Sequence, residues 1–325
     1  MVAPAETTSV WVTGATSFLG RHVARQFARD GVEVVGFARR PIAEAEFRTH
    51  GFAAVEVGEF DEELLRQGFD RHGAPAAVFH AIGSGSVGQA AADPQADIAR
   101  TVNSLRVLLE FLAGSAPNAR LVYPSSAAIY GDAGEQGLAE DAQADPISVY
   151  GQTKWLAEEL CRAQARHSGL ELVIARLFSV YGPLQHKLLL WELAQRLLSG
   201  QRRIELGGTG REARDFVFAP DAAAMICRLA MLPDATGTFN IGTGVATSIR
   251  DLAGELAVAL GVRAEIEFNG LTRPGDPAHQ RADPARLLQT TGLAFTPLRR
   301  GLSNYAEWLR EQHAEQATRA AGART

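Results

Sequence analysis

A tyrosine and a lysine near the middle of the chain have the types and spacing that proton transfer requires. Tyr150 and Lys154 stand in the segment SVYGQTK, residues 148–154, which reads as the first turns of a helix with Ser148 as its N-cap. Residues four apart share one helix face. A phenol has a pKa of about 10, and an ammonium nearby lowers it by favouring the phenolate. We predict that the pair exchanges a proton with a sugar or alcohol oxygen, although such spacing also occurs on solvated helices.

The chain begins with a pattern that is typical of dinucleotide binding. Ser9 to Thr13 reads as a buried strand, a glycine turn follows it, and a helical pattern comes next. Gly14 permits the turn and a close approach to a pyrophosphate, and Gly20 lets the helix pack on the sheet. Amides at the helix start would hold the phosphates. A plain strand–helix turn is the alternative. The cofactor contacts expected here are Gly14, Thr16, Ser17, Phe18, Leu19 and Gly20, with Ser17 where a third glycine is usual.

The end of the second predicted strand, Val32 to Phe37, indicates which dinucleotide binds. An NAD-preferring site would place an acidic residue there to bond the ribose 2′-hydroxyl. Here Ala38 is followed by Arg39 and Arg40, and two guanidiniums could bind a 2′-phosphate. We therefore expect NADP as the preferred cofactor. The alternative is that both arginines are solvated and the site takes NAD.

Three more predicted strands end in residues that suit a ligand site. Ala54 to Val57 is followed by Glu59 and Phe60, which could border the adenine. Ala76 to Ala81 leads into small residues that allow close approach of a ligand; here we expect Ala81, Ile82 and Gly83 at the cofactor and Ser84 at the substrate. His80 lies within this apolar strand and reads as a core histidine. The strand Arg120 to Pro124 ends in Ser125 and Ser126.

The alternation of strands with helices predicts an α/β fold, a doubly wound parallel (Rossmann) sheet with a smaller C-terminal α/β lobe. Ligands of such sheets bind beyond the carboxyl ends of the strands. Gly14, Ala38, Gly83 and Ser126 all fall at strand ends, so we expect them to line one crevice. Ser126 would meet Tyr150 and Lys154 there.

The C-terminal half is expected to interleave with this sheet. We assign residues 1–178 to the dinucleotide-binding domain with 219–242 packed back on it, and residues 179–218 and 243–312 to a substrate lobe. Residues 313–325 read as a flexible tail after a last helix from Leu298 to Arg310. The substrate would lie in the cleft between the lobes, where Lys187, at the start of a predicted helix, could face it.

The charge, cysteines and apolar segments of the chain limit the kinds of partner that it can bind. The net charge of −5 argues against general binding of nucleic acid or membrane surfaces. Cys161 and Cys227 lack metal-site spacing and read as buried thiols, so no metal is expected. With no signal pattern and no apolar window long enough to span a bilayer, a cytoplasmic protein is expected.

Seven motifs in order resemble the extended short-chain dehydrogenase/reductase family, which comprises nucleotide-sugar epimerases, dehydratases and reductases. They are TGATSFLG (13–20), YPSSAAIYG (123–131), SVYGQTK (148–154), RLFSVYGP (176–183), RDFVFAPD (214–221), FNIGTG (239–244) and RPGD (273–276).

The resemblance implies roles for individual residues. Ser126 takes the family's catalytic Ser/Thr position, Tyr150 that of the acid/base, and Lys154 that of its activator and ribose ligand. Arg214 and Arg273 match arginines that contact the nucleotide diphosphate, a role that suits the guanidinium fork. Ser179 stands at a position near the substrate where many members carry Asn. The resemblance also implies a homodimer formed through the helices expected at 93–112 and 148–166.

Several reactions are open to such an enzyme. Ala127 and Ala128 replace the acidic pair of the sugar 4,6-dehydratases, which weighs against dehydration. The motifs fit both a 4-keto-sugar-nucleotide reductase and a nucleotide-sugar 4-epimerase. Because an arginine-rich ribose site suits exchangeable NADPH, we favour the reductase slightly. A non-catalytic dinucleotide sensor is a remote alternative, since a sensor does not need Ser126, Tyr150 and Lys154.

Overall fold

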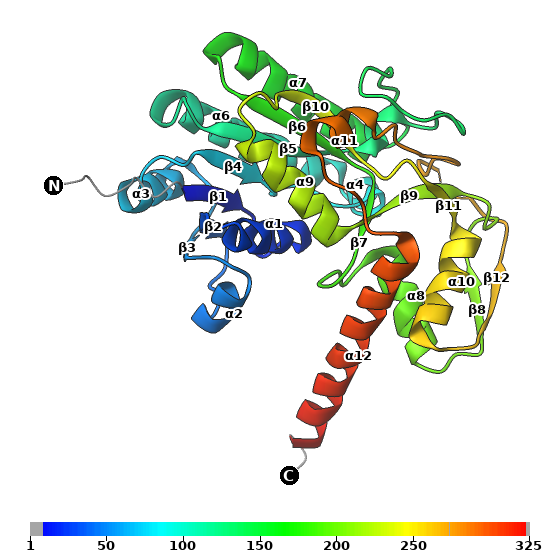
Figure 1. Cartoon of the computed structure of the whole chain (residues 1–325). Helices are drawn as coiled ribbons and strands as arrows, with labels where there is room; N and C mark the ends of the chain where they lie inside the picture. Colours follow the sequence, from blue (N-terminus) through cyan, green and yellow to red (C-terminus); the bar gives the residue numbers. More distant parts are fainter. Residues whose placement is uncertain (1–8, 273, 323–325) are drawn as a thin grey trace.

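A seven-stranded parallel sheet forms the centre of the molecule (Figure 1). The computed structural model describes residues 9–272 and 274–322. The strand order is β10-β6-β5-β4-β1-β2-β3, and every neighbouring pair is parallel. The strands are β1 (Ser9–Thr13), β2 (Glu33–Ala38), β3 (Ala54–Val57), β4 (Ala77–His80), β5 (Arg120–Ser126), β6 (Leu172–Leu177) and β10 (Gly237–Ile241). Their apolar runs are buried on both faces, as helices on each side require.

Helices cover both faces of this sheet and confirm the predicted doubly wound fold. On one face α1 (Phe18–Arg29) packs against α9 (Ala219–Met231). On the other, α6 (Ser104–Ser115) lies between α3 (Glu62–His72) and α7 (Val149–Ser168). Each face has its own apolar core. The shorter helices are α2 (Glu44–Thr49), α4 (Val87–Ala92), α11 (Ala285–Thr291) and the 3₁₀ turn η2 (Ala127–Tyr130).

The helix predicted from Asp93 to Leu112 is divided into three parts. It consists of α5 (Pro94–Ile98), a π-helical turn η1 (Ala99–Asn103) and α6. The Asp93 side chain caps α5 by accepting a hydrogen bond from the amide of Ala96 at 3.0 Å. A π turn inserts one residue into the helical repeat and changes which side chains face inward. Periodicity alone could not place it.

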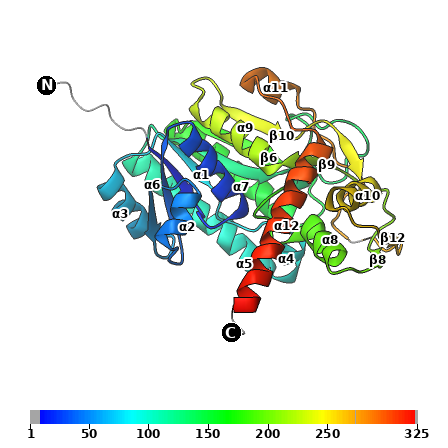
Figure 2. The same ribbon diagram turned by 60° about the horizontal axis from the view of Figure 1, so that its bottom comes forward.

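A smaller lobe lies beside the carboxyl ends of the strands (Figure 2). It has a three-stranded sheet, a two-stranded sheet and three helices around a separate apolar core. These elements are β7 (Ser179–Tyr181), β8 (Arg203–Leu206), β9 (Ala213–Phe218), β11 (Ala246–Ser248), β12 (Glu265–Phe268), α8 (Leu188–Leu198), α10 (Ile249–Leu260) and α12 (Leu298–Gly322). Helix α12 projects from the body (Figure 1) and continues past its predicted end at Arg310, so residues read as a flexible tail are helical as far as Gly322.

Asp215 on β9 links segments of the two lobes through hydrogen bonds. Its buried carboxylate accepts hydrogen bonds from the amides of Thr243 at 2.8 Å, Gly244 at 2.8 Å and Ala282 at 3.2 Å. These bonds join the segment after β10 to the substrate-side strand β9. No helix in the described part of the chain is long and apolar enough to cross a membrane.

Candidate active site

A cavity of about 760 Å³ opens at the carboxyl ends of β4, β5 and β6, against the smaller lobe. Its walls come from the start of α1, the segment after β4, the end of β5, the start of α7 and the residues around β7 and α8. Such a volume suits an organic cofactor or substrate. The predicted residues that line it are Thr16, Ser17, Phe18, Leu19, Ala81, Ile82, Gly83, Ser84, Ser126, Tyr150, Lys154, Ser179, Lys187 and Arg214.

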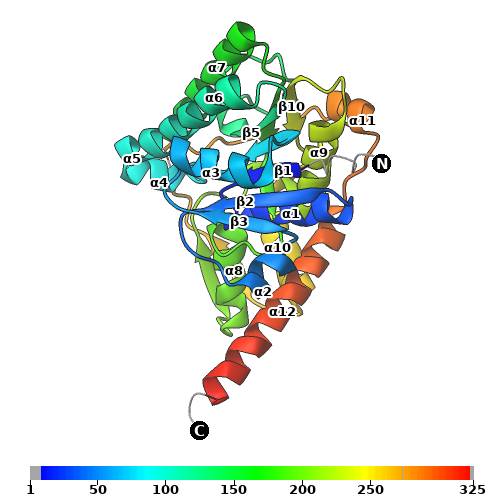
Figure 3. The same cartoon turned by 90° about the vertical axis from the view of Figure 1, so that its left-hand side faces the viewer.

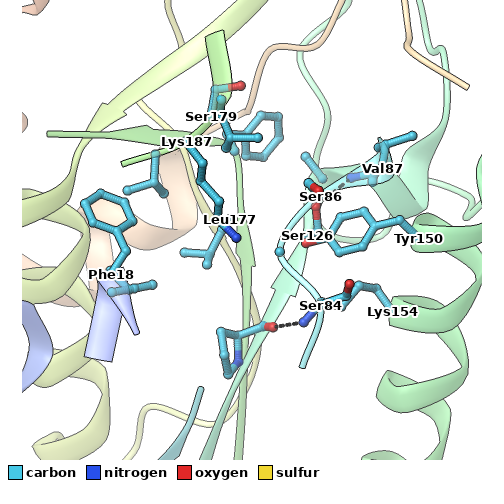
Figure 4. Close-up of a pocket in the computed structure, with 18 of the residues that line it drawn as sticks. Phe18, Ser84, Ser86, Val87, Ser126, Tyr150, Lys154, Leu177, Ser179 and Lys187 are labelled. Atoms are coloured by element: carbon cyan, nitrogen blue, oxygen red, sulfur yellow. Dashed lines mark hydrogen bonds between the residues drawn. The ribbon is translucent and has the colours of Figure 1, made fainter. Parts of the chain in front are cut away.

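Ser126, Tyr150 and Lys154 meet in this cavity (Figure 4). Ser126 ends β5, and Tyr150 and Lys154 lie one turn apart on α7. Ser148 caps that helix as predicted, its Oγ accepting a hydrogen bond from the amide of Gly151 at 3.1 Å. The Lys154 Nζ donates to the carbonyl of Pro124 at 2.9 Å. The strand end and the helix start therefore place a hydroxyl, a phenol and an ammonium on one wall.

The acid–base balance of the phenol differs from the expectation. Burial raises the pKa of Tyr150 to about 12, although its hydrogen bond with Ser126 opposes this and the Asp97 carboxylate adds to it. The Lys154 Nζ is bonded to the Pro124 carbonyl and lies 5.9 Å from the Tyr150 ring centroid. Burial in turn lowers the pKa of Lys154 to about 8. In this structure Tyr150 is therefore a protonated phenol at neutral pH.

The glycine turn is built as predicted, and Ser17 has a role that the sequence did not reveal. The Ser17 Oγ caps α1 by accepting a hydrogen bond from the amide of Gly20 at 3.0 Å. Gly14 has φ of +74°, and a Cβ there would come within 3.0 Å of the Ala81 carbonyl oxygen. Gly14 and Gly20 shape the turn without lining the cavity. A serine in an N-cap position, three residues before Gly20, was the available signal.

Of the four strand-end residues expected in one crevice, Gly83 lines this cavity together with Ser126, whereas Gly14 and Ala38 are not among its lining residues. Ala38 is buried at the end of β2, whereas Arg39 and Arg40 are exposed. Gly14 nevertheless follows β1, which pairs with β4, and a Cβ on it would lie 3.0 Å from the carbonyl oxygen of Ala81, a residue of the cavity wall. The cavity lining also does not include Glu59 and Phe60. Glu59 is exposed, and the Phe60 ring centroid lies 5.6 Å from that of His80.

His80 is the core histidine that was expected. It is 1% exposed, and its Nδ1 lies 2.8 Å from the Thr13 Oγ1. Burial lowers its pKa to about 3, so it is neutral at pH 7. Cys161 and Cys227 are buried free thiols, also as expected.

Polar side chains of the smaller lobe and of the segment after β4 form the opposite wall. Lys187 faces Ser126 and Tyr150 across the opening (Figure 4), and a Cβ on Gly85 would lie 3.1 Å from the Lys187 Nζ. The Arg214 Nη1 donates to the carbonyl oxygens of Ala213 at 2.9 Å and Ala278 at 3.2 Å. Ser84, whose amide donates to the Thr101 Oγ1 at 3.3 Å, and Ser179 complete this wall. Arg273 lies outside the described residues.

The loop before α8 is strained where it borders the cavity. Leu184 and Leu188 both have φ of +71°, a region that costs energy for a residue with a Cβ. The neighbouring Pro183 carbonyl accepts a hydrogen bond from the His22 Nε2 at 2.8 Å. Burial lowers the pKa of His22 to about 4, so the neutral ring donates this bond at pH 7. Neither the positive φ angles nor the bond from His22 to Pro183 could be predicted from the sequence pattern.

A buried ion pair behind the cavity was also missed. Glu158 on α7 is fully buried, and its carboxylate accepts bonds from Arg176 of β6 at 2.8 and 3.0 Å. The same guanidinium donates to the Tyr130 hydroxyl at 2.8 Å. Glu158 falls four residues after Lys154, but a glutamate in a polar helix usually faces solvent, so its burial could not be read from spacing.

Known proteins resemble this chain in sequence and in structure. The model of the NAD dependent epimerase/dehydratase family matches residues 10–242. UDP-glucuronate 4-epimerase 4 of Arabidopsis thaliana is 27% identical, over 92% of this chain and 75% of that protein. The UDP-glucose 4-epimerase of Thermotoga maritima, solved with UDP-glucose, superposes with a TM-score of 0.84 at 27% identity, over 94% of this chain and 99% of that one.

A further solved structure adds a bound cofactor. The UDP-glucose 4-epimerase of Thermus thermophilus in complex with NAD superposes with a TM-score of 0.83 at 25% identity, covering 93% of this chain and 99% of that one. The family match spans the dinucleotide turn, β5, α7 and β10, which carry the residues gathered above. The chain therefore belongs to the NAD dependent epimerase/dehydratase family and is an enzyme of the extended short-chain dehydrogenase/reductase type.

Proposed function

We propose that the protein is a nucleotide-sugar 4-epimerase. The observation that carries this proposal is the meeting of Ser126, Tyr150 and Lys154 in one cavity of a chain that matches 4-epimerases over more than nine tenths of its length. The reductase favoured from Arg39 and Arg40 has less support, because the resembling proteins described above are 4-epimerases. The alternative named in the sequence analysis is therefore the better account.

The proposed reaction uses the cavity wall that carries Ser126 and Tyr150. A bound nicotinamide dinucleotide supplies the acceptor and donor of a hydride. Tyr150 accepts the proton of the C4 hydroxyl as a 4-keto sugar forms, and returns it after the sugar turns its other face. Ser126 donates a hydrogen bond to the C4 oxygen as negative charge develops there. Because the hydride returns to C4 and the proton returns to the C4 oxygen, no redox equivalent is consumed.

Four arginines would contact the charged parts of the ligands. We propose that Arg214, held by two backbone carbonyls, contacts the diphosphate of the nucleotide sugar, and that Arg273 joins it. The exposed Arg39 and Arg40 would let the ribose site accept NADP as well as the NAD bound by the Thermus enzyme. Replacing both with alanine should weaken NADP binding and leave NAD binding unchanged.

The decisive experiment supplies UDP-glucose and UDP-glucuronate separately, each with NAD, and follows the sugar anomeric signals by proton NMR. The proposal expects the C4 epimer to accumulate to equilibrium with no net change in absorbance at 340 nm. A 4-keto-sugar-nucleotide reductase would instead oxidise NADPH stoichiometrically and form no epimer. That second result, obtained with a 4-keto nucleotide sugar, would replace the epimerase proposal with the reductase.

A further inference from the structure

Asp97 is a buried carboxylate that the proposed reaction does not use. It lies on α5 and is 2% exposed. Neither of its oxygens has a hydrogen-bond partner among the described residues. Burying a charge without a partner is costly, and an unsatisfied buried group in a folded protein calls for an explanation.

The surroundings of Asp97 connect it to the catalytic wall. Helix α5 packs against α7, which carries Tyr150 and Lys154. Lys154 is 5% exposed, and its Nζ lies 5.1 Å from the ring centroid of Tyr123, a fully buried residue whose hydroxyl also lacks a partner. Asp97, Tyr123 and Lys154 are buried, whereas Tyr150 is partly exposed and lines the cavity together with Lys154. We call these four residues the Asp97 cluster.

Acidic groups on several elements influence the pKa of Lys154. Burial lowers its pKa, and the Asp97 carboxylate opposes that effect more than Glu158 and Cys161 do. Glu158 is already paired with Arg176 at 2.8 Å and Arg162 at 2.7 Å.

The remaining titratable neighbours of Lys154 contribute little charge at pH 7. His80 on β4 is neutral because burial lowers its pKa to about 3, and burial raises the pKa values of Tyr123, Tyr150 and Cys161. Asp97 is therefore the acidic group near Lys154 that no described cation already neutralises.

We propose that Asp97 is a positioning residue that acts through Lys154: its carboxylate keeps the Lys154 ammonium charged in the buried site. The charged ammonium can then orient the Tyr150 phenol and a dinucleotide ribose in the proposed epimerisation, on which this role rests. The need to keep Lys154 charged explains why an unpaired carboxylate is placed in the interior near it.

The sequence offers a direct test, because Lys154 and Lys187 are its only lysines. Protein labelled with ¹³Cε-lysine gives two side-chain signals, and each can be titrated in the free enzyme. In wild type the Lys154 signal should titrate near pH 8. In Asp97→Asn its midpoint should fall by about 1 pH unit or more, since a nearby opposite charge shifts a pKa by about that much. The Lys187 signal should not move.

Two variants serve as controls. Asp97→Glu keeps the charge and should return the Lys154 midpoint toward wild type. Asp93→Asn changes an exposed carboxylate on the N-cap of the same helix and should leave the midpoint unchanged. Because Asp97 has no hydrogen bond to lose, Asp97→Asn should melt no lower than wild type, whereas a purely structural role predicts a lower melting temperature.

Activity supplies the second measurement. The alkaline limb of kcat should move to lower pH in Asp97→Asn by the same amount as the Lys154 signal. Equal Lys154 midpoints in wild type and Asp97→Asn would overturn the proposal, as would a wild-type Lys154 that is already neutral at pH 7. Since the titration needs no substrate, a shifted midpoint in a protein that fails to epimerise would refute the proposed function and leave the role of Asp97 standing.

Discussion

Tyr150 combines a reactive position with an environment that keeps it protonated. The free site holds the phenol neutral because burial outweighs the hydrogen bond with Ser126. A base near neutral pH requires a lower pKa, so ligand binding must change this balance. The Lys154 Nζ, now bonded to Pro124, is the nearest group able to do so by turning toward the ring.

Replacing Tyr150 with phenylalanine should lower turnover by about 10²- to 10⁴-fold, because the proton carrier is lost. Dinucleotide affinity should change little, since the cavity walls remain. Steady-state epimerisation and fluorescence titration with NADH measure the two quantities. Tyr305→Phe is the matched control, as its buried hydroxyl in the smaller lobe has no partner. A fully active Tyr150→Phe enzyme would exclude Tyr150 as the acid/base.

At the scale of single residues, the sequence predicted which side chains meet but not how their contacts set their pKa values. Helical spacing brings Tyr150 and Lys154 together, and a strand end brings Ser126 to them. The bond from Lys154 to Pro124 and the burial of Asp97 depend on how α5 and α7 pack. No local pattern encodes that packing, so the sequence could not predict that burial raises the pKa of Tyr150 in the free site.

The start of α1 has no room for a side chain at position 20. A Cβ on Gly20 would lie 2.6 Å from the Ser17 Oγ and 2.8 Å from the Gly14 carbonyl oxygen. Gly20→Ala should therefore displace the dinucleotide turn at a cost of about 1–3 kcal/mol, and each 1.4 kcal/mol carried into binding weakens dinucleotide affinity about tenfold. Calorimetric titration with NAD measures this.

Gly254→Ala in α10 is the control for that substitution. A Cβ there meets nothing within 4 Å, so alanine should stabilise the helix by about 0.5–1 kcal/mol and leave dinucleotide binding alone. Equal NAD affinities for Gly20→Ala and wild type would show that the turn does not shape the cofactor site.

Helix α7 is fixed to the sheet by the ion pair of Glu158 with Arg176. Glu158→Ala should destabilise the fold by about 3–5 kcal/mol, because the buried guanidinium loses its counter-charge. Glu159→Ala removes a half-exposed carboxylate one residue further on and should cost less than about 1 kcal/mol. Urea unfolding of both variants gives the comparison; similar midpoints would show that the buried pair adds little.

Helices and strands with a clear hydrophobic pattern were predicted well, whereas elements whose formation depends on tertiary packing were not. The strands at Ser9–Thr13 and Ala54–Val57 have the predicted bounds. The π turn at Ala99–Asn103 and the short strand β7 were missed. Both depend on long-range contacts, since β7 forms only by pairing with β9.

The whole molecule should lose stability in mild acid. Burial lowers the pKa values of His22 and His50 to about 4 and of His80 to about 3, against an ordinary value of 6.5. Between those limits the unfolded chain binds more protons, so stability is full above pH 6.5 and falls toward pH 4. The lowered pKa of Glu158 acts in the same direction, whereas the raised pKa values of Asp215 and Asp221 oppose it.

His22→Gln isolates one part of this effect. A glutamine amide can still donate to Pro183 but does not titrate. A pKa that falls from 6.5 to about 4 corresponds to roughly 3 kcal/mol. Between pH 6.5 and 4, the unfolding free energy of the variant should therefore fall by about 3 kcal/mol less than that of wild type. Melting temperatures of wild type and His22→Gln across this pH range measure the difference. Melting temperatures that fall equally with pH in the two proteins would contradict the prediction.

One outer face has the features of a subunit interface. Helices α6 and α7 lie side by side there (Figure 3), and Trp155 and Leu156 of α7 are 44% and 49% exposed. We propose that two chains associate through this face, since exposed apolar patches mark interaction sites. Light scattering should give twice the 34.8 kDa mass for wild type and a monomer for Trp155→Glu. Val258→Glu, at an exposed site on α10, should stay dimeric; a monomeric wild type would contradict the interface.

The strand order also bears on how the chain acquires its shape during synthesis. The edge strand β10 pairs with β6 but is separated from it in sequence by β7, α8, β8, β9 and α9. The central sheet thus stays incomplete on the ribosome until residue 241 has emerged. Neither lobe can finish folding as an independent N-terminal unit, so the nascent protein must keep one sheet edge open while half of the other lobe is still being translated.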